Sequence, residues 1–236
     1  MKAGIIGAME PEVAILKSKL ENVQTEEYSG YKFYSGQIEG NDVVLVQSGI
    51  GKVAASMATL LMIDKFSPDY IVNTGSAGGF DQSLKVGDIV IGSELRYNDV
   101  NVTAFGYEIG QLPANPPAYI PHADLVDAAK DSISSLENIQ TLVGQITTGD
   151  TFMTAEDDIA KARENFPKMA AVEMEGAAIA QTCYQCNVPF VVIRSMSDIA
   201  GKESPTSFEA YLETASVNSS QMVINLLNVL KGKQLS

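Results

Sequence analysis

The sequence predicts one α/β domain built around a mixed β-sheet. The chain has 236 residues, of which 45% are hydrophobic, and this is enough for one large core without a second domain. Short apolar segments typical of strands alternate with segments typical of helices, which favours parallel strand pairs, and one early hairpin adds antiparallel pairs. There is no internal repeat, linker or low-complexity segment, so we expect residues 1–236 to form a single domain.

The N-terminal segment begins with a buried strand and a helix. Ala3–Gly7 is a short apolar run. Pro11 stands where a helix over residues 12–20 would begin, because proline suits the first helical turn. Two further strands are predicted over Tyr31–Ile38 and residues 42–47, and the short polar turn between them makes them a hairpin.

The alternation of strands and helices continues to the C-terminus. Further strands are predicted over residues 69–73, 88–92, 142–147, 170–172 and 190–194. Further helices are predicted over residues 52–65, 123–134, Glu156–Asn165, 176–183 and 207–231. A glycine-rich turn is expected at residues 74–79, and residues 111–121 hold four prolines and predict a loop.

Polar or glycine-rich segments follow six of the predicted strands. These segments come after Gly7, Gln47, Asn73, Thr147, Val172 and Arg194. In α/β folds, ligands bind at the carboxyl ends of the strands. We therefore expect the six segments to converge on one ligand site.

The charge of the chain limits the partners that it can bind. The formal net charge is −13 and the sequence pI is about 4.4. Proteins that bind nucleic acid need clustered Lys and Arg, and the chain has no such cluster. Anionic partners are disfavoured at long range. A neutral or cationic small molecule is therefore the expected ligand, and no nucleic acid is expected.

The two cysteines are expected to be ordinary reduced thiols. Cys183 and Cys186 have the spacing of a redox or metal motif, but they lie at the end of a predicted helix. A zinc site needs about four ligands, and the one histidine is His122. We expect no metal and no cofactor. The N-terminus does not resemble a signal peptide and no segment reaches the ~20 apolar residues of a membrane span, so we expect a cytoplasmic protein without membrane contact.

Several acidic residues follow predicted strands, and each has two interpretations. Glu12 would suit the positive end of a helix dipole as well as a reactive site. Glu173 and Glu175 lie at a strand-to-helix junction, where one of them is expected to face a pocket and to accept from adjacent ribose hydroxyls; an ordinary helix-start glutamate is the alternative. Asp198 could be a turn residue, and Arg194 could form a structural ion pair.

Six sequence runs together resemble the 5′-methylthioadenosine/S-adenosylhomocysteine nucleosidases over essentially the whole chain. The runs are GIIGAME at 4–10, SGIGKVAA at 48–55, NTGSAGG at 73–79, VTAFGY at 102–107, VEME at 172–175 and RSMSD at 194–198. The resemblance implies a single nucleoside phosphorylase-like α/β domain, with a mixed, twisted and partly closed sheet surrounded by helices. It also implies a nucleoside substrate and a homodimer in which the partner subunit partly closes the pocket for the 5′ substituent.

The resemblance assigns catalytic roles to two carboxyl groups. Glu12 would be the base that takes a proton from the attacking water, and Asp198 the acid that protonates the leaving adenine. Glu175 would hold the ribose hydroxyls. Cleavage of the ribosyl–adenine bond builds positive charge on the ribose, so a site rich in carboxylates suits the chemistry.

The resemblance also implies a set of substrate-binding residues. Met9 and Met174 would pack on the sugar, Phe152 and Met153 would face adenine, and Phe208 would cap the base-and-sugar end. Ser76 and Arg194 would orient the acidic pair, and Ile50, Gly78 and Ser197 complete the wall. Phe105, Tyr107 and Pro113 would line the 5′ pocket, some of them reaching over from the partner subunit.

The implied activity is hydrolysis of 5′-methylthioadenosine, S-adenosylhomocysteine and 5′-deoxyadenosine to adenine and the 5-substituted ribose, within methionine salvage. One alternative is a purine nucleoside phosphorylase, but such enzymes carry a phosphate-binding arginine after the first strand, where this chain has Met9 and Glu10. Another is a non-catalytic nucleoside-binding or storage protein, which would not need Glu12 and Asp198 together. The loop at residues 98–121 is expected to set the preference among these substrates and 6-amino-6-deoxyfutalosine.

Overall fold

The computed structural model describes residues 1–135, 139–200 and 204–236. Within them, nine strands form one sheet in the order β2-β3-β4-β1-β5-β8-β7-β6-β9. The strands are β1 (Ala3–Gly7), β2 (Glu21–Tyr28), β3 (Tyr31–Ile38), β4 (Asn41–Gln47), β5 (Tyr70–Gly79), β6 (Ile89–Tyr97), β7 (Thr141–Thr148), β8 (Met169–Glu173) and β9 (Phe190–Ile199). Strand β1 lies parallel to β4 and β5, whereas β2, β3 and β4 are antiparallel neighbours. The predicted mixed sheet with an early hairpin is therefore confirmed.

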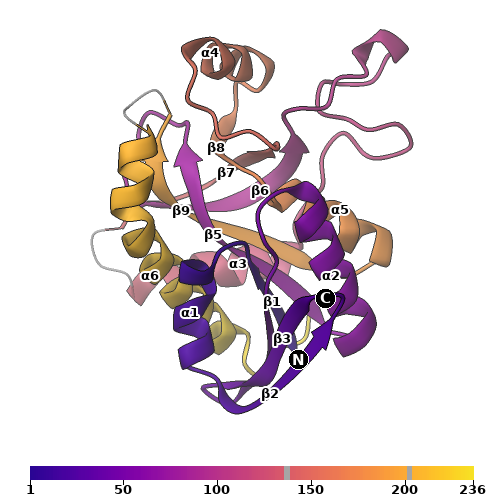
Figure 1. Cartoon of the computed structure of the whole chain (residues 1–236), viewed down its shortest axis with the longest axis vertical. Helices are drawn as coiled ribbons and strands as arrows, with labels where there is room; N and C mark the ends of the chain where they lie inside the picture. The colour runs from indigo at the N-terminus through magenta and orange to yellow at the C-terminus, as the bar shows by residue number, and fades with distance from the viewer. Residues whose placement is uncertain (136–138, 201–203) are drawn as a thin grey trace.

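Part of the sheet closes on itself. Strand β9 pairs in parallel with β5 and in antiparallel with β6. Strands β5, β8, β7, β6 and β9 therefore form a ring, and β1 to β4 extend from it as an open sheet (Figure 1). This arrangement confirms the partly closed sheet that the family resemblance implies.

Helices cover both faces of the sheet (Figure 1). The described helices are α1 (Glu10–Ser18), α2 (Lys52–Phe66), α3 (Ala123–Asp131), α4 (Glu156–Asn165), α5 (Gly176–Cys186) and α6 (Ser204–Leu230). Val13, Leu125 and Leu226 belong to a core cluster on the side of α1, α3 and α6. Met62 and Ile179 belong to a second cluster on the side of α2 and α5. None of the described helices is both long enough and apolar enough to cross a lipid bilayer.

Strand β1 and helix α1 follow the prediction closely. All five residues of β1 are buried, because β4 and β5 pair with its two edges and helices cover its faces. The chain then turns at Met9, and Pro11 lies in the first turn of α1. Helix α1 ends at Ser18 rather than at residue 20. This short connection places Glu12 directly at the carboxyl end of β1.

Strand β2 was not predicted. It pairs with β3 alone and forms the outer edge of the sheet. Its sequence, ENVQTEEY, is exposed along nearly its whole length, so it has no buried face and no alternation of apolar and polar residues. A polar edge strand of this kind protects the sheet against pairing with other chains and leaves no periodic signal in the sequence.

The prediction of a glycine-rich turn at residues 74–79 is wrong, because these residues form the second half of β5. It pairs with β9 and, at Gly78 and Gly79, with β8. Strand β9 likewise continues five residues past Arg194, so Asp198 lies within a strand. The glycines permit this because neighbouring side chains occupy the space that a Cβ would fill: a Cβ at Gly79 would lie 2.8 Å from Ile199.

The other differences concern element ends. Helix α3 ends at Asp131 and continues as a 3₁₀ turn (Ser132–Ser135), helix α5 extends to Cys186, and α6 begins at Ser204. Strand β6 extends to Tyr97. Sequence patterns rarely fix such ends to better than a few residues, because the last turns depend on tertiary contacts.

Candidate active site

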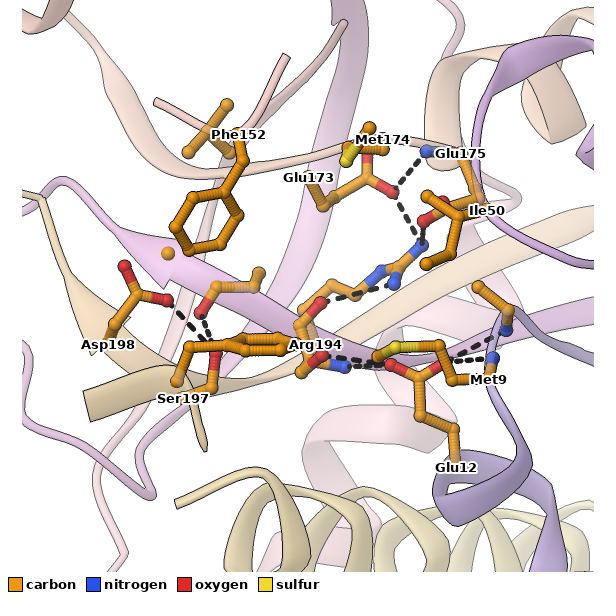
Figure 2. A pocket seen from close by; sticks show the side chains of 16 residues that line it. Met9, Glu12, Ile50, Phe152, Glu173, Met174, Glu175, Arg194, Ser197 and Asp198 are labelled. Carbon is orange, nitrogen blue, oxygen red and sulfur yellow. Dashed lines mark hydrogen bonds and ion pairs between the residues drawn. The ribbon is translucent and has the colours of Figure 1, made fainter. Parts of the chain in front are cut away.

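A cavity of about 340 Å³ opens where the carboxyl-end segments of β1, β5, β8 and β9 meet the loop before α2 and the side of α6. Its volume lies in the range of small-molecule sites. The lining residues are Ala8, Met9, Glu12, Ile50, Ser76, Ala77, Gly78, Phe152, Val172, Glu173, Met174, Glu175, Arg194, Ser197, Asp198 and Phe208. The predicted convergence on one cavity is therefore confirmed for all six segments that follow the predicted strands, and Figure 2 shows the side chains around the cavity.

Glu12 lies on the wall formed by α1 and β5 and is only 1% exposed. Its Oε2 accepts from the backbone N–H groups of Ala8 at 2.8 Å and Met9 at 3.0 Å. Its Oε1 accepts from the N–H and the hydroxyl of Ser76, both at 2.9 Å. Four donors and the N-terminus of α1 therefore hold a carboxylate at this position, which is what a fixed general base requires.

Gly75 shows how closely β5 approaches this carboxylate. A Cβ at residue 75 would lie 2.7 Å from Oε1 of Glu12 and 2.9 Å from Nη1 of Arg194. The residue also has a backbone φ of +152°, which residues with a side chain rarely adopt. The glycine therefore lets the Glu12 carboxylate and the Arg194 guanidinium both reach the strand backbone.

Arg194 is the buried cation behind the cavity, and it is 1% exposed. Its Nη2 donates to Asn73 Oδ1 at 2.6 Å and also pairs with Glu173, and its Nη1 donates to the Ser76 carbonyl at 3.2 Å. Burial works to lower the pKa of Arg194, but the nearby carboxylates, Glu173 first, hold it above its ordinary value. Arg194 therefore remains charged and fixes the side chains around it.

Glu173 uses its carboxylate to build the junction between β8 and α5. Its Oε2 accepts from the N–H groups of Glu175 at 2.9 Å and Gly176 at 2.6 Å and also pairs with Arg194. Its Oε1 accepts from the Thr148 hydroxyl. With four donors already in place, Glu173 has little capacity left for a ligand.

Glu175 faces the cavity and has more capacity than Glu173 to accept hydrogen bonds from a ligand. Its Oε1 accepts from the Gly51 N–H at 2.9 Å, and its Oε2 lies 3.5 Å from Arg194 Nη2. Burial, and to a smaller extent the neighbouring Glu173, raise its pKa to about 7 against the opposing charge of Arg194. Hydroxyl donors from a ligand would stabilise the charged form. The geometry thus supports Glu175 rather than Glu173 as the group that binds a diol.

Asp198 lies across the cavity from Glu12, on the side of Phe152 (Figure 2). It is 3% exposed, and the Ser197 hydroxyl donates to its Oδ1 at 3.0 Å. A Cβ at Gly78 would lie 3.2 Å from its Oδ2, so the glycine allows the carboxyl group to pack against β5. Two carboxyl groups on opposite walls can serve the two ends of one reacting bond.

Apolar side chains form the rest of the wall. Phe152 and Phe208 pack edge to face, with ring centroids 5.5 Å apart and planes at 71°. Met9, Met174 and Ile50 line the remainder. Flat apolar surfaces beside a few carboxylates suit a ligand with an aromatic base and a hydroxylated sugar.

Four predicted residues do not line the cavity. Met153 packs instead against the apolar cluster that contains Phe80 and Phe166. Phe105 is 81% exposed, and Tyr107 and Pro113 also lie away from this cavity. These four residues do not form a wall of the cavity in this structure.

The lining residues that were not predicted are Ala8, Ala77, Val172 and Glu173. The first three are small or apolar residues next to predicted ones. For Glu173 the sequence does carry a signal, because a glutamate at the end of a buried strand needs partners and indicates a structural ion pair.

The described residues offer no arrangement for a metal ion. Within residues 1–135, 139–200 and 204–236, no group of three or more His, Cys, Asp or Glu side chains could hold one. Cys183 and Cys186 are free cysteines, and burial raises the pKa of the Cys183 thiol. Both cysteines lie in α5, which extends past the predicted end at residue 183, and Cys183 acts as a small buried apolar residue.

Comparisons with known proteins agree on one family. The family model described as the phosphorylase superfamily matches residues 2–230. A 5′-methylthioadenosine/S-adenosylhomocysteine nucleosidase from Colwellia psychrerythraea is 70% identical over 100% of this chain and 99% of its own length, and one from Pseudoalteromonas translucida is 62% identical over the whole of both chains. The crystal structure of the Colwellia nucleosidase with adenine has a TM-score of 0.99 and 71% identity, covering 100% of this chain and 98% of that one. The Neisseria meningitidis nucleosidase in complex with methylthio-immucillin-A has a TM-score of 0.93 and 44% identity, covering 95% and 97%.

Proposed function

The chain belongs to the phosphorylase superfamily and, within it, to the 5′-methylthioadenosine/S-adenosylhomocysteine nucleosidases, and from this we propose how its cavity cleaves the nucleoside. The enzyme is an N-ribosyl hydrolase that releases adenine from 5′-methylthioadenosine and S-adenosylhomocysteine. We add 5′-deoxyadenosine as a proposed substrate, as the family resemblance implies.

The proposed reaction is an attack of water on C1′ of the ribose. Glu12 accepts a proton from the water, whose oxygen forms the new bond to C1′. The bond between C1′ and N9 breaks, its electron pair goes to adenine, and Asp198 gives a proton to the imidazole nitrogen of the leaving base. Glu175 accepts from the ribose hydroxyls, and Phe152 packs against adenine. The products are adenine and the 5-substituted ribose.

The charge of the cavity supports this mechanism. Among the described lining residues, the carboxyl groups of Glu12, Glu173, Glu175 and Asp198 face one cation, Arg194. Positive charge develops on the ribose in the transition state. Negative charge that is already fixed in a dry cavity stabilises such a state without further reorganisation.

The position of Glu12 is the observation that favours water over phosphate as the nucleophile. Its carboxylate occupies the turn after β1, where a phosphate-binding arginine would be needed, and Arg194 is held by Glu173 and Asn73. A phosphate dianion would meet a carboxylate there. We expect the purified chain to release adenine from 5′-methylthioadenosine at the same rate with and without phosphate. Release that requires phosphate, with ribose 1-phosphate as product, would identify a phosphorylase, and binding without release would identify a storage protein.

Protonation of Glu175 should link stability to pH. Its pKa is raised from 4.5 to about 7 in the folded chain, so the folded chain keeps a proton that the unfolded chain releases. The group's contribution to stability is therefore complete below pH 4.5 and is lost as the pH rises through about 7. We expect urea unfolding to show that wild type loses stability over this range relative to Glu175→Gln. Parallel pH dependences of the two proteins would contradict the raised pKa.

We also propose that a second copy of the chain completes the site. Val53, Met57 and Leu60 form an exposed apolar stripe on α2, at 71%, 46% and 53% exposure, and Ile50 continues the stripe into the cavity. The exposed Phe105 has no contact with its own cavity, so a symmetric partner could supply it. We expect sedimentation to give twice the chain mass, and Met57→Glu to give monomers with weaker nucleoside binding. A wild-type monomer with full activity would overturn this proposal.

A cytoplasmic location of the protein stays a prediction.

A further inference from the structure

Three charged residues meet at the rim of the cavity, outside the catalytic groups. Lys52 opens α2, Asp99 follows β6, and Asp150 follows β7. Lys52 Nζ lies 2.6 Å from Asp99 Oδ2 and 3.8 Å from Asp150 Oδ2. The side chains are 25%, 28% and 49% exposed. We call these three residues the rim clip.

The rim clip also holds backbone groups. The Lys52 N–H donates to Asp150 Oδ1 at 2.9 Å, and the Asp150 N–H donates to Asp99 Oδ2 at 3.1 Å. Helix α2 begins after Gly51, which has no side chain to cap it. Asp150 therefore takes the place of an N-cap residue, although it comes from a different part of the chain.

The N–H group of the preceding residue, Gly51, contacts a carboxylate of the candidate active site. The Gly51 N–H donates to Glu175 Oε1 at 2.9 Å. A Cβ at Gly51 would lie 3.1 Å from Asp150 Oδ1, so the Asp150 carboxylate packs directly on this peptide. Two carboxylates from different segments thus accept from consecutive N–H groups, Glu175 from that of the N-cap residue Gly51 and Asp150 from that of Lys52, the first residue of α2. Movement of one N–H would move the other, because they are one residue apart.

We propose that the rim clip is a positioning device for the ribose-binding carboxylate, and that Asp150 is its central residue. Asp150 fixes the Lys52 peptide, the Lys52 peptide fixes the Gly51 N–H, and the Gly51 N–H orients Glu175. Lys52 and Asp99 hold Asp150 in place. This inference rests on the proposed role of Glu175 in binding the ribose hydroxyls. If the rim clip were only a surface ion-pair cluster, its removal would change stability little and would leave substrate binding unchanged.

The test compares steady-state constants for 5′-methylthioadenosine with the inhibition constant of adenine, which lacks the ribose. We expect Asp150→Ala to raise KM about tenfold, as for the loss of one positioned hydrogen bond, with kcat changed less than about twofold. The inhibition constant of adenine should stay unchanged. Asp150→Asn keeps an oxygen that can accept from the Lys52 N–H and should restore most of the affinity. Lys130→Ala removes a similar ion pair, with Asp127, away from the cavity and should change none of these constants.

Three outcomes would overturn the proposal that the rim clip positions Glu175. An unchanged KM in Asp150→Ala is the first. An equal loss of adenine affinity is the second, because it would mean that Asp150 acts through the nearby Phe152 instead. The third is an effect of Asp150→Ala on kcat/KM that persists in the Glu175→Gln background. If Glu175→Gln itself leaves KM unchanged, both the proposed ribose-binding role of Glu175 and the proposal for the rim clip are wrong. If Glu175→Gln raises KM but Asp150→Ala does not, only the proposal for the rim clip is wrong.

Discussion

Glu12→Gln should lower kcat for adenine release by about 10²- to 10⁴-fold, the usual contribution of a general base. An amide cannot take the proton of the attacking water. Nucleoside affinity should change far less, because in the proposed binding mode Glu175 holds the ribose and Phe152 packs against the base. A pre-steady-state measurement of adenine release beside an equilibrium binding titration would separate the two effects.

The same substitution should also destabilise the fold. Glu12 accepts from Ala8 and Met9 on one oxygen and from the backbone N–H and hydroxyl of Ser76 on the other. In either orientation, the NH₂ group of glutamine would face a backbone donor, which costs about 1–3 kcal/mol. The activity must therefore be measured below the thermal transition of the variant.

Glu10→Gln is the matched control for Glu12. Glu10 lies in the same helical turn but is exposed and does not line the cavity. Its substitution changes the charge of the chain by the same amount and should leave kcat within about twofold, since exposed charges contribute little. Comparable losses in both variants would show that Glu12 acts through the general field at the helix start rather than as the base.

The sequence placed the three carboxyl groups of the mechanism correctly in one cavity. Glu12 and Glu175 follow β1 and β8, and Asp198 lies near the carboxyl end of β9. Because the carboxyl ends of neighbouring strands in an α/β fold lie together, strand order along the chain was enough to predict their convergence. Their catalytic roles came from the family resemblance, because spacing alone left each of them open to a structural interpretation.

The glycine-rich half of β5 could not be predicted from local propensity. Gly75 and Gly78 are typical of turns, but here they lie in a strand. They leave room for the carboxyl groups of Glu12 and Asp198, which would lie 2.7 and 3.2 Å from a Cβ at these two positions. The division of labour between Glu173 and Glu175 was also hidden, because it depends on how many donors from β7, β9 and α5 reach each carboxylate. Both features are set by tertiary contacts that no pattern in the sequence encodes.

Asp198→Asn should have an effect of similar size to Glu12→Gln, but one that depends on the leaving group. We expect adenine release to fall by about 10²- to 10⁴-fold, because asparagine cannot protonate the departing base. A 5-methylthioriboside of 4-nitrophenol needs no such proton, since its leaving group departs as a stable anion. Asp198→Asn should cleave that substrate within about tenfold of wild type, whereas Glu12→Gln should be impaired on both substrates.

This difference follows from the placement of the two groups on opposite walls. Asp198 lies beside Phe152, on the side where the base would bind, and Ser197 can still donate to the oxygen of asparagine, so the pocket shape should survive. Asp88→Asn is a suitable control, because Asp88 is also buried and accepts from backbone N–H groups but does not line the cavity. It should leave both rates unchanged. Equal losses on the two substrates in Asp198→Asn would mean that Asp198 stabilises the ribose charge and does not deliver the proton, because only proton delivery depends on what leaves.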